Sequence, residues 1–195
     1  MNNLTEIEIL EFINKKTVYK RETLSKAFNM KCEKITLTDG MIFIAKYYLK
    51  KNNEFNSIQS EINSLKFLSV KFSLLFPSIL YSSENLLIMN FIEHNDIKNE
   101  DYQKNFANDI LKIHGETNSN YGFSFDAQIG GICQTNDFDS NWVNFFREKR
   151  LNIIFEKINK KNSLPKEMNI KIEKIIKNLE NRLPKSPKAR LLHGD

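Results

Sequence analysis

The amino-acid sequence predicts an α+β fold in two lobes, the first mixed and the second mostly helical. Up to residue 93, β-prone runs flank one long helical pattern, whereas from residue 94 onward helical patterns recur with loops between them. A chain of 195 residues is long enough for two small lobes. We therefore expect the lobes to span residues 1–93 and 94–195.

The first lobe is expected to begin with a short helix followed by a hairpin. Apolar residues recur at helical spacing over residues 4–14. Residues 31–37 alternate, and residues 41–48 form a dense β-prone run. Asp39-Gly40 between these runs suits the positive φ angles of a tight turn. The helical positions are Leu4, Ile7, Leu10 and Ile13.

The same lobe is expected to continue with its main helix and a second hairpin. An amphipathic helix is predicted from Phe55, and Pro77 ends the pattern. Strands are predicted over residues 79–81 and 86–92, on either side of a polar turn. The result is an antiparallel sheet with one main helix. The apolar residues that recur along one face of that helix are Ile58, Ile62, Leu65 and Leu68.

Residues 91–96 are expected to be the hinge that leads into the second lobe. Within that lobe, three amphipathic helices are expected, each with one apolar face. Between the first two faces, residues 121–139 have the glycines, aromatics and amides of a structured loop. The faces comprise Phe106, Ile110, Ile113 and His114; Trp142, Phe145, Phe146 and Ile153; and Ile170, Ile172, Ile175, Ile176 and Leu179.

Composition argues against several classes of function. The net charge of +5 comes from lysines interspersed with acidic residues, and no aromatic-basic motif accompanies them, so nucleic-acid binding ranks last. Cys32 and Cys133 lie far apart and form no CxxC pair, which predicts neither a metal site nor a disulfide and suits the cytosol. The start of the chain does not resemble a secretory signal, and no apolar run is long enough for a membrane span.

Lys46 is the first candidate for chemistry, because it ends a strand that we expect to be buried on both sides. A buried ammonium requires an anion, either a nucleotide phosphate or a carboxylate. Glu61, on the following helix, can supply the carboxylate and reproduce the Lys–Glu pair with which kinases hold nucleotide phosphates. The alternative is that both side chains are solvated.

An apolar strand runs into the proposed hinge. Backbone groups at such a place can pair with the edge of an adenine ring while apolar side chains cover its faces. An ordinary core strand would explain the same residues. The candidate adenine-binding residues are Met89, Asn90, Phe91, Ile92 and Glu93.

The last residues, His193-Gly194-Asp195, follow an apolar segment. In kinase-like enzymes an Asp at such a place accepts the proton of the substrate hydroxyl, so Asp195 is the candidate general base. His114 is assigned no chemistry. The three histidines of the chain have no metal-ligand spacing, and no metal-binding residue is predicted.

A longer signature lies in the second half of the chain. Gln134-Thr135-Asn136 leads into residues 141–151, which begin Asn-Trp-Val-Asn-Phe-Phe, and Leu191-Leu192-His193-Gly194-Asp195 follows later. In order and spacing these residues resemble the fructosamine kinase family. The resemblance implies a protein-kinase-like fold of the aminoglycoside-phosphotransferase type. It also implies transfer of the ATP γ-phosphate to the sugar 3-hydroxyl of fructosamine or ribulosamine adducts, free or on proteins, in protein deglycation.

The resemblance also implies roles for individual residues. Lys46 and Glu61 match the phosphate-orienting pair, Met89 to Glu93 match the adenine-binding hinge, and Asp195 matches the catalytic base. The remaining matches fall on the family signature near the substrate. They are Gln134, Asn136 and Trp142.

Two departures from the family pattern bear on these expectations. Family members carry a Gly-Gly pair in the first hairpin, where this chain has Ala27-Phe28. The family also continues past the catalytic Asp with the residues that bind Mg²⁺, which we expect beyond residue 195. We therefore expect the chain as given to be incomplete, with little or no kinase activity. A non-catalytic, pseudokinase-like interaction module is the alternative.

Overall fold

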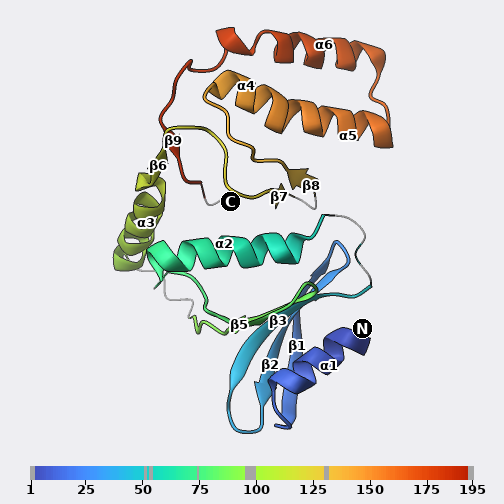
Figure 1. Ribbon diagram of the computed structural model, residues 1–195, viewed down its shortest axis with the longest axis vertical. Helices are drawn as coiled ribbons and strands as arrows, with labels where there is room; N and C mark the ends of the chain where they lie inside the picture. The colour runs from blue at the N-terminus through green and yellow to red at the C-terminus, as the bar shows by residue number, and fades with distance from the viewer. Residues whose placement is uncertain are drawn as a thin grey trace. The chain divides into compact units, whose positions relative to one another are not determined.

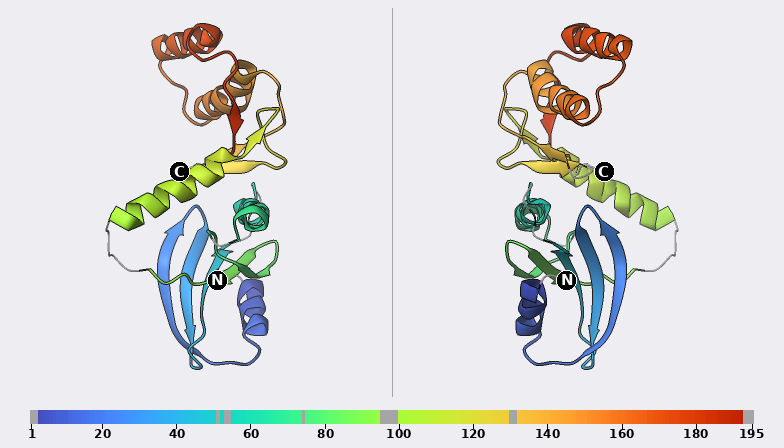
Figure 2. Two further views of the ribbon diagram at one scale, coloured as in Figure 1. Left: turned by 90° about the vertical axis from the view of Figure 1, so that its left-hand side faces the viewer. Right: turned by 90° about the vertical axis from the view of Figure 1, so that its right-hand side faces the viewer.

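A computed structural model describes residues 3–50, 52, 55–73, 75–94, 100–129 and 132–192. The chain divides into two units, Met1–Lys98 and Asn99–Asp195. The first contains a sheet with two helices, and the second is mostly helical, which confirms the predicted α+β class. Figures 1 and 2 show the elements of each unit.

The first unit is built on a five-stranded antiparallel sheet with the strand order β1-β2-β3-β5-β4 (Figure 2). The predicted hairpin is present, because β2 pairs with β3 around the Asp39-Gly40 turn. The predicted pair of later strands is also present. The strands are β1 (Val18–Ala27), β2 (Met30–Leu37), β3 (Ile42–Tyr48), β4 (Ile79–Ser82) and β5 (Leu86–Asn90).

Strand β1 was not expected from the sequence. Most of its side chains are exposed, so it lacks the alternation of apolar and polar residues by which a strand is recognised. It joins β2 through the two-residue turn Phe28-Asn29, in which both residues have positive φ (49° and 62°). Such turns match the twist of the paired strands.

Helices α1 (Asn3–Phe12) and α2 (Ser57–Phe72) cover opposite faces of the central strands β3 and β5 (Figure 1). Side chains alternate along β3, so Phe43, Ala45 and Tyr47 join the core under α1. Tyr48 joins the core under α2, together with Leu87 and Met89 of β5. The sheet therefore separates two apolar layers.

Helix α1 is present, but only part of the apolar spacing that predicts it faces the sheet. Ile7 and Leu10 are each 50% exposed, whereas Ile9 is fully buried and Ile13 is 3% exposed. The buried positions follow four-residue steps through Thr5, Ile9 and Ile13, so of the predicted positions Ile13 is buried and Ile7 and Leu10 are not. In α2 three of the four predicted residues, Ile58, Ile62 and Leu65, are buried, and the fourth, Leu68, is half-buried.

In the second unit, α6 lies alongside the consecutive helices α4 and α5 (Figures 1 and 2). A π-helical segment, Arg147–Asn152, joins α4 to α5. Short strands pair β6 with β9 and β7 with β8. The elements are α3 (Glu100–Gly115), β6 (Thr117–Asn118), β7 (Ala127–Ile129), β8 (Ile132–Gln134), α4 (Trp142–Phe146), α5 (Ile153–Lys161), α6 (Lys166–Lys177), a 3₁₀ turn (Leu179–Asn181) and β9 (Ala189–Arg190).

Candidate active site

The structure brings Lys46 and Glu61 together. Lys46 lies on the α2 face of β3, and its ammonium forms an ion pair with the Glu61 carboxylate of α2. The two side chains remain 25% and 33% exposed, so the pair lies at an accessible edge of the layer under α2. Cys32 of β2 pairs directly with Lys46 of β3. Burial raises the pKa of the Cys32 thiol. The Lys46 ammonium can thus meet a ligand from solvent while Glu61 orients it.

Two residues that were not predicted fix α2 on the sheet near this pair. Asn56 caps the helix, with its side-chain oxygen accepting a hydrogen bond from the Gln59 N–H at 3.0 Å. The Tyr48 hydroxyl lies 2.8 Å from the N–H of Ser57 and accepts its hydrogen bond. An Asn directly before the helical pattern is a recognisable N-cap signal, but nothing in the sequence pairs it with Tyr48.

The proposed hinge follows directly from β5. Met89 is 8% exposed and lies opposite Ile44 of β3, which places an apolar row beside Lys46. Pairing of β5 with β3 ends at Asn90, whose side-chain oxygen accepts a hydrogen bond from the Ser78 N–H. Residues 91–94 form no helix or strand. Phe91 is half-buried there, and Ile92 and Glu93 are exposed.

The turn between β1 and β2 contains Phe28, one of the two residues expected at the Gly-Gly position of the family. Phe28 is 67% exposed at its tip. The side chain of Asn29 exchanges two hydrogen bonds of 3.1 Å with the backbone of Lys50, just beyond β3. A left-handed conformation is uncommon for a bulky residue, and it is held here by the strand pairing on either side.

A buried polar cluster under α1 was also missed. Glu33 of β2 is 2% exposed and accepts hydrogen bonds from Lys31 and from the Tyr47 hydroxyl, the latter at 2.7 Å. Arg21 lies 3.7 Å from Glu33 and makes a two-pronged ion pair with Glu6 of α1. Burial and the hydrogen bond to Glu33 raise the pKa of Tyr47. This cluster ties α1 to three strands.

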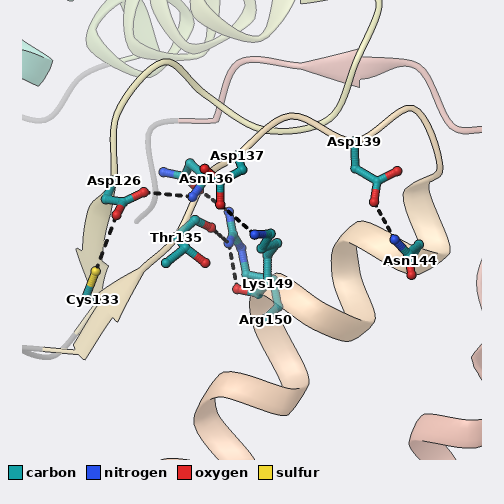
Figure 3. Close-up of polar contacts among 9 residues, drawn as sticks. All are labelled: Asp126, Cys133, Thr135, Asn136, Asp137, Asp139, Asn144, Lys149 and Arg150. Atoms are coloured by element: carbon teal, nitrogen blue, oxygen red, sulfur yellow. Dashed lines mark hydrogen bonds and ion pairs between the residues drawn. The ribbon is translucent and has the colours of Figure 1, made fainter.

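In the second unit, Asn136 is 5% exposed and its hydrogen-bonding groups are used within the protein (Figure 3). Its side-chain oxygen accepts from Arg150 at 2.6 Å, and its side-chain nitrogen donates to the Phe125 carbonyl at 3.0 Å. Its N–H donates to Asp126, and its carbonyl accepts from Phe123. Asn136 therefore organises the loop.

Arg150 is the counterpart of Asn136 on the π-helical segment, and sequence reasoning gave it no role. Its guanidinium also donates to the Thr135 carbonyl at 2.9 Å and lies 4.7 Å from the centre of the Phe145 ring. Beside it, Lys149 forms an ion pair with Asp137, which Figure 3 also shows. The signature segment is thus fixed to the helix that follows it.

The other two predicted substrate residues differ from Asn136. Trp142 packs against Tyr121 with ring centres 5.2 Å apart, and its indole nitrogen is buried with no hydrogen-bond partner among the described residues. Gln134 ends β8 opposite Ala127 and is half-buried. Within residues 100–129 and 132–192, its amide makes no hydrogen bond to another side chain.

Gly122 is required for the loop that carries these residues. Its φ is +127°, and an added Cβ would lie 2.6 Å from the Asn136 carbonyl oxygen. We expect Gly122→Ala to lower the free energy of unfolding by about 3 kcal/mol, since both backbone strain and a clash contribute. Gly40→Ala is the matched control, because φ there is +89° but no atom lies within 4 Å, and it should cost about 1 kcal/mol. Equal losses in urea unfolding would contradict the clash.

Asp195 lies outside the described residues, as do His193 and Gly194. The segment that leads to them is described as far as Leu192. It is held by pairing of Arg190 with Thr117 and by a hydrogen bond from the Leu191 N–H to the Glu116 carbonyl.

The described residues contain neither a metal-binding cluster nor a membrane-spanning helix. In residues 3–50, 52, 55–73, 75–94, 100–129 and 132–192, no cluster of three or more His, Cys, Asp or Glu side chains could hold a metal ion. Over the same ranges, no helix has the length and apolarity needed to cross a membrane.

Comparison with known proteins adds to this geometry. The family model described as fructosamine kinase matches residues 13–195. A probable ketoamine kinase from Enterococcus faecium is 29% identical over 157 residues, which cover 76% of this chain and 54% of that protein. The chain thus spans about half the length of the curated relatives that it matches.

Solved structures show the same fold. A solved structure from Thermobifida fusca, described as a putative fructosamine-3-kinase, superposes with a TM-score of 0.80 at 17% identity, covering 97% of this chain and 65% of that one. An ADP-bound aminoglycoside phosphotransferase gives a TM-score of 0.55 at 19% identity, covering 93% and 59%. The predicted kinase-like fold is therefore confirmed.

Proposed function

Because this chain belongs to the fructosamine kinase family, we propose that it contributes nucleotide-binding and substrate-binding residues of an ATP-dependent ketosamine 3-kinase. The substrate would be a fructosamine or ribulosamine adduct, free or on a protein, and the physiological role would be deglycation. The observation that carries the proposal is the Lys46–Glu61 ion pair.

Lys46 and Glu61 fit a nucleotide phosphate. The Lys46 ammonium is partly exposed and is already oriented by the Glu61 carboxylate. It can therefore bind a phosphate oxygen without first being freed from a buried position. The Tyr48 hydroxyl and the Asn56 cap hold α2 in place, and with it Glu61. In the proposed reaction Lys46 holds the phosphates in position and Glu61 keeps the lysine aligned.

The region after β5 fits the base of the nucleotide. Ile44 and Met89 provide an apolar row next to Lys46, and residues 91–93 lie beyond the end of strand pairing. Their backbone groups can therefore meet the polar edge of adenine. When bound, ATP supplies the phosphoryl group that is transferred.

For the acceptor substrate, we assign Asp195 as the base that takes the proton of the sugar hydroxyl, and Gln134 and Trp142 as binding residues. An amide can donate to one sugar hydroxyl and accept from another, and an indole can cover an apolar sugar face. Asn136 would contribute by holding the loop. The described residues offer no cluster suited to Mg²⁺, and none is assigned to it.

The proposal is tested by thermal unfolding of the full chain with and without Mg-ATP, followed by an assay of phosphate transfer to a ribulosamine. A competent site should stabilise the protein by about 2.7 kcal/mol at a ligand concentration 100 times Kd. The alternative, a pseudokinase-like interaction module, predicts no nucleotide-dependent shift. The transfer assay tests the separate expectation that the chain as given has little or no kinase activity. The absence of any shift at millimolar ATP would refute nucleotide binding.

A further inference from the structure

The α2 face of the sheet carries a second cation besides Lys46. Along β2, Glu33, Ile35 and Leu37 are buried on the α1 side. Lys34 therefore points to the opposite face, the one that carries Lys46. Strand register places Lys34 directly across from Ile44, two residues before Lys46. The two lysines are thus diagonal neighbours on adjacent strands, within reach of one small ligand.

The two cations differ in how they are neutralised. Lys46 is paired with Glu61. The Lys34 ammonium instead lies 4.0 Å from the centre of the Phe91 ring, and no carboxylate among the described residues pairs with it. A ring face offsets only a small part of a positive charge. Lys34 is therefore the less compensated cation on this face.

Its contact also places Lys34 over the proposed base-binding row. Lys34 starts in the row that contains Ile44 and Met89, and its side chain must extend across β3 to reach Phe91, two residues beyond Met89. A base that enters this row would displace the ammonium from the ring. Phosphates that extend from the base toward Lys46 would then lie within reach of the released ammonium.

The turn between β1 and β2 leaves a phosphate few groups to contact. Phe28 and Asn29 form a two-residue turn, and the side chain of Asn29 is committed to the backbone of Lys50. Neither turn residue is small, and small residues let backbone N–H groups approach a phosphate closely. A side-chain cation can supply attraction that such N–H groups would otherwise provide.

We propose that Lys34 is a phosphate-binding residue of the nucleotide site, held on Phe91 in the free protein and released onto the α- and β-phosphates when the nucleotide binds. It compensates for the Phe28-Asn29 turn. This proposal rests on ATP being the ligand of the site, as argued above, and it concerns residues of the first unit alone.

The test is calorimetric titration of the full chain and of Lys34→Met with ATP and with adenosine. Methionine keeps an apolar stem of similar length and removes the charge. ATP affinity should fall about threefold to fivefold, because a single partly exposed ion pair between Lys34 and a phosphate contributes little binding energy. The affinity of the variant should also depend less on salt concentration. Adenosine affinity should stay within about twofold, since adenosine carries no phosphate.

Two further variants serve as controls. Lys34→Arg keeps the charge and should retain the ATP affinity of the unmodified chain. Lys26→Met removes an exposed β1 lysine and should change neither affinity, which excludes an effect of net charge. Unfolding temperatures of all variants establish that each is folded.

The possible failures are distinct. If the unmodified chain binds ATP and Lys34→Met binds it equally well, Lys34 has no role at the phosphates and the inference is wrong. If ATP and adenosine weaken together, Lys34 supports the base or the fold instead, which also overturns it. If the unmodified chain binds no ATP, the proposed function itself fails.

Discussion

Replacing Lys46 with methionine is expected to lower kcat/KM for ketosamine phosphorylation by about 100-fold or more. Methionine preserves the apolar stem on β3 but removes the charge that holds the phosphates, an interaction that strengthens as charge develops in the transition state. The stabilisation of the chain by Mg-ATP should be lost in parallel. Steady-state kinetics of the protein that carries this sequence and thermal unfolding of the chain are the two measurements.

Lys66→Met is the control for this substitution. Lys66 lies on α2, one turn beyond Glu61, and is exposed. The same change there should leave kcat/KM within about twofold, because surface lysines away from a site contribute little. Retained turnover in Lys46→Met would show that another group orients the phosphates.

Replacing Glu33 with glutamine is expected to lower the free energy of unfolding by about 2 to 3 kcal/mol at pH 7. The change keeps the shape of the side chain and removes a carboxylate that is 2% exposed. Lys31 and Arg21 then lose a shared partner, although both retain some contact with water. Urea unfolding measures the loss. Glu22→Gln, in an exposed pair with Lys20, should cost less than about 0.5 kcal/mol.

The effect of Glu33→Gln should depend on pH in a defined direction. Burial alone would raise the pKa of Glu33, but hydrogen bonds from Lys31 and Tyr47 outweigh it and lower the pKa below the ordinary 4.5. A lowered pKa in the folded state means that stability is gained above 4.5 and is lost as pH falls through the folded value. The difference between the two proteins should therefore shrink below pH 4.5. A constant difference down to pH 3 would contradict a charged Glu33.

Elements with a strong apolar period could be predicted from the sequence. Helix α2 repeats its apolar residues over four turns, and the Asp39-Gly40 turn lies between two β-prone runs, so both were placed correctly. Strand β1 gave no such signal, because its side chains are mostly exposed and it is held by backbone pairing to β2. Pairing between backbones leaves little trace in the amino-acid sequence.

The candidate site shows a similar division. Lys46 and Glu61 could be paired from the order of a strand and the helix after it, and the structure places them in contact. The links between Asn136 and Arg150 and between Glu33 and Tyr47 join residues 14 apart along the chain. No periodic pattern specifies such pairs, since each depends on how a strand or loop packs. Polar partners of this kind become visible only in the fold.

The alternation in β3 also decides which changes of chain length the protein can absorb. One residue gained or lost inside this strand would turn Lys46 toward the apolar layer beneath α1 and Tyr47 away from Glu33, because each side chain would move to the other face. The Gly40 turn, where no neighbouring atom crowds the backbone, can lengthen without that exchange. Natural relatives should therefore differ in length at the Gly40 turn, whereas within β3 they should differ only by substitutions.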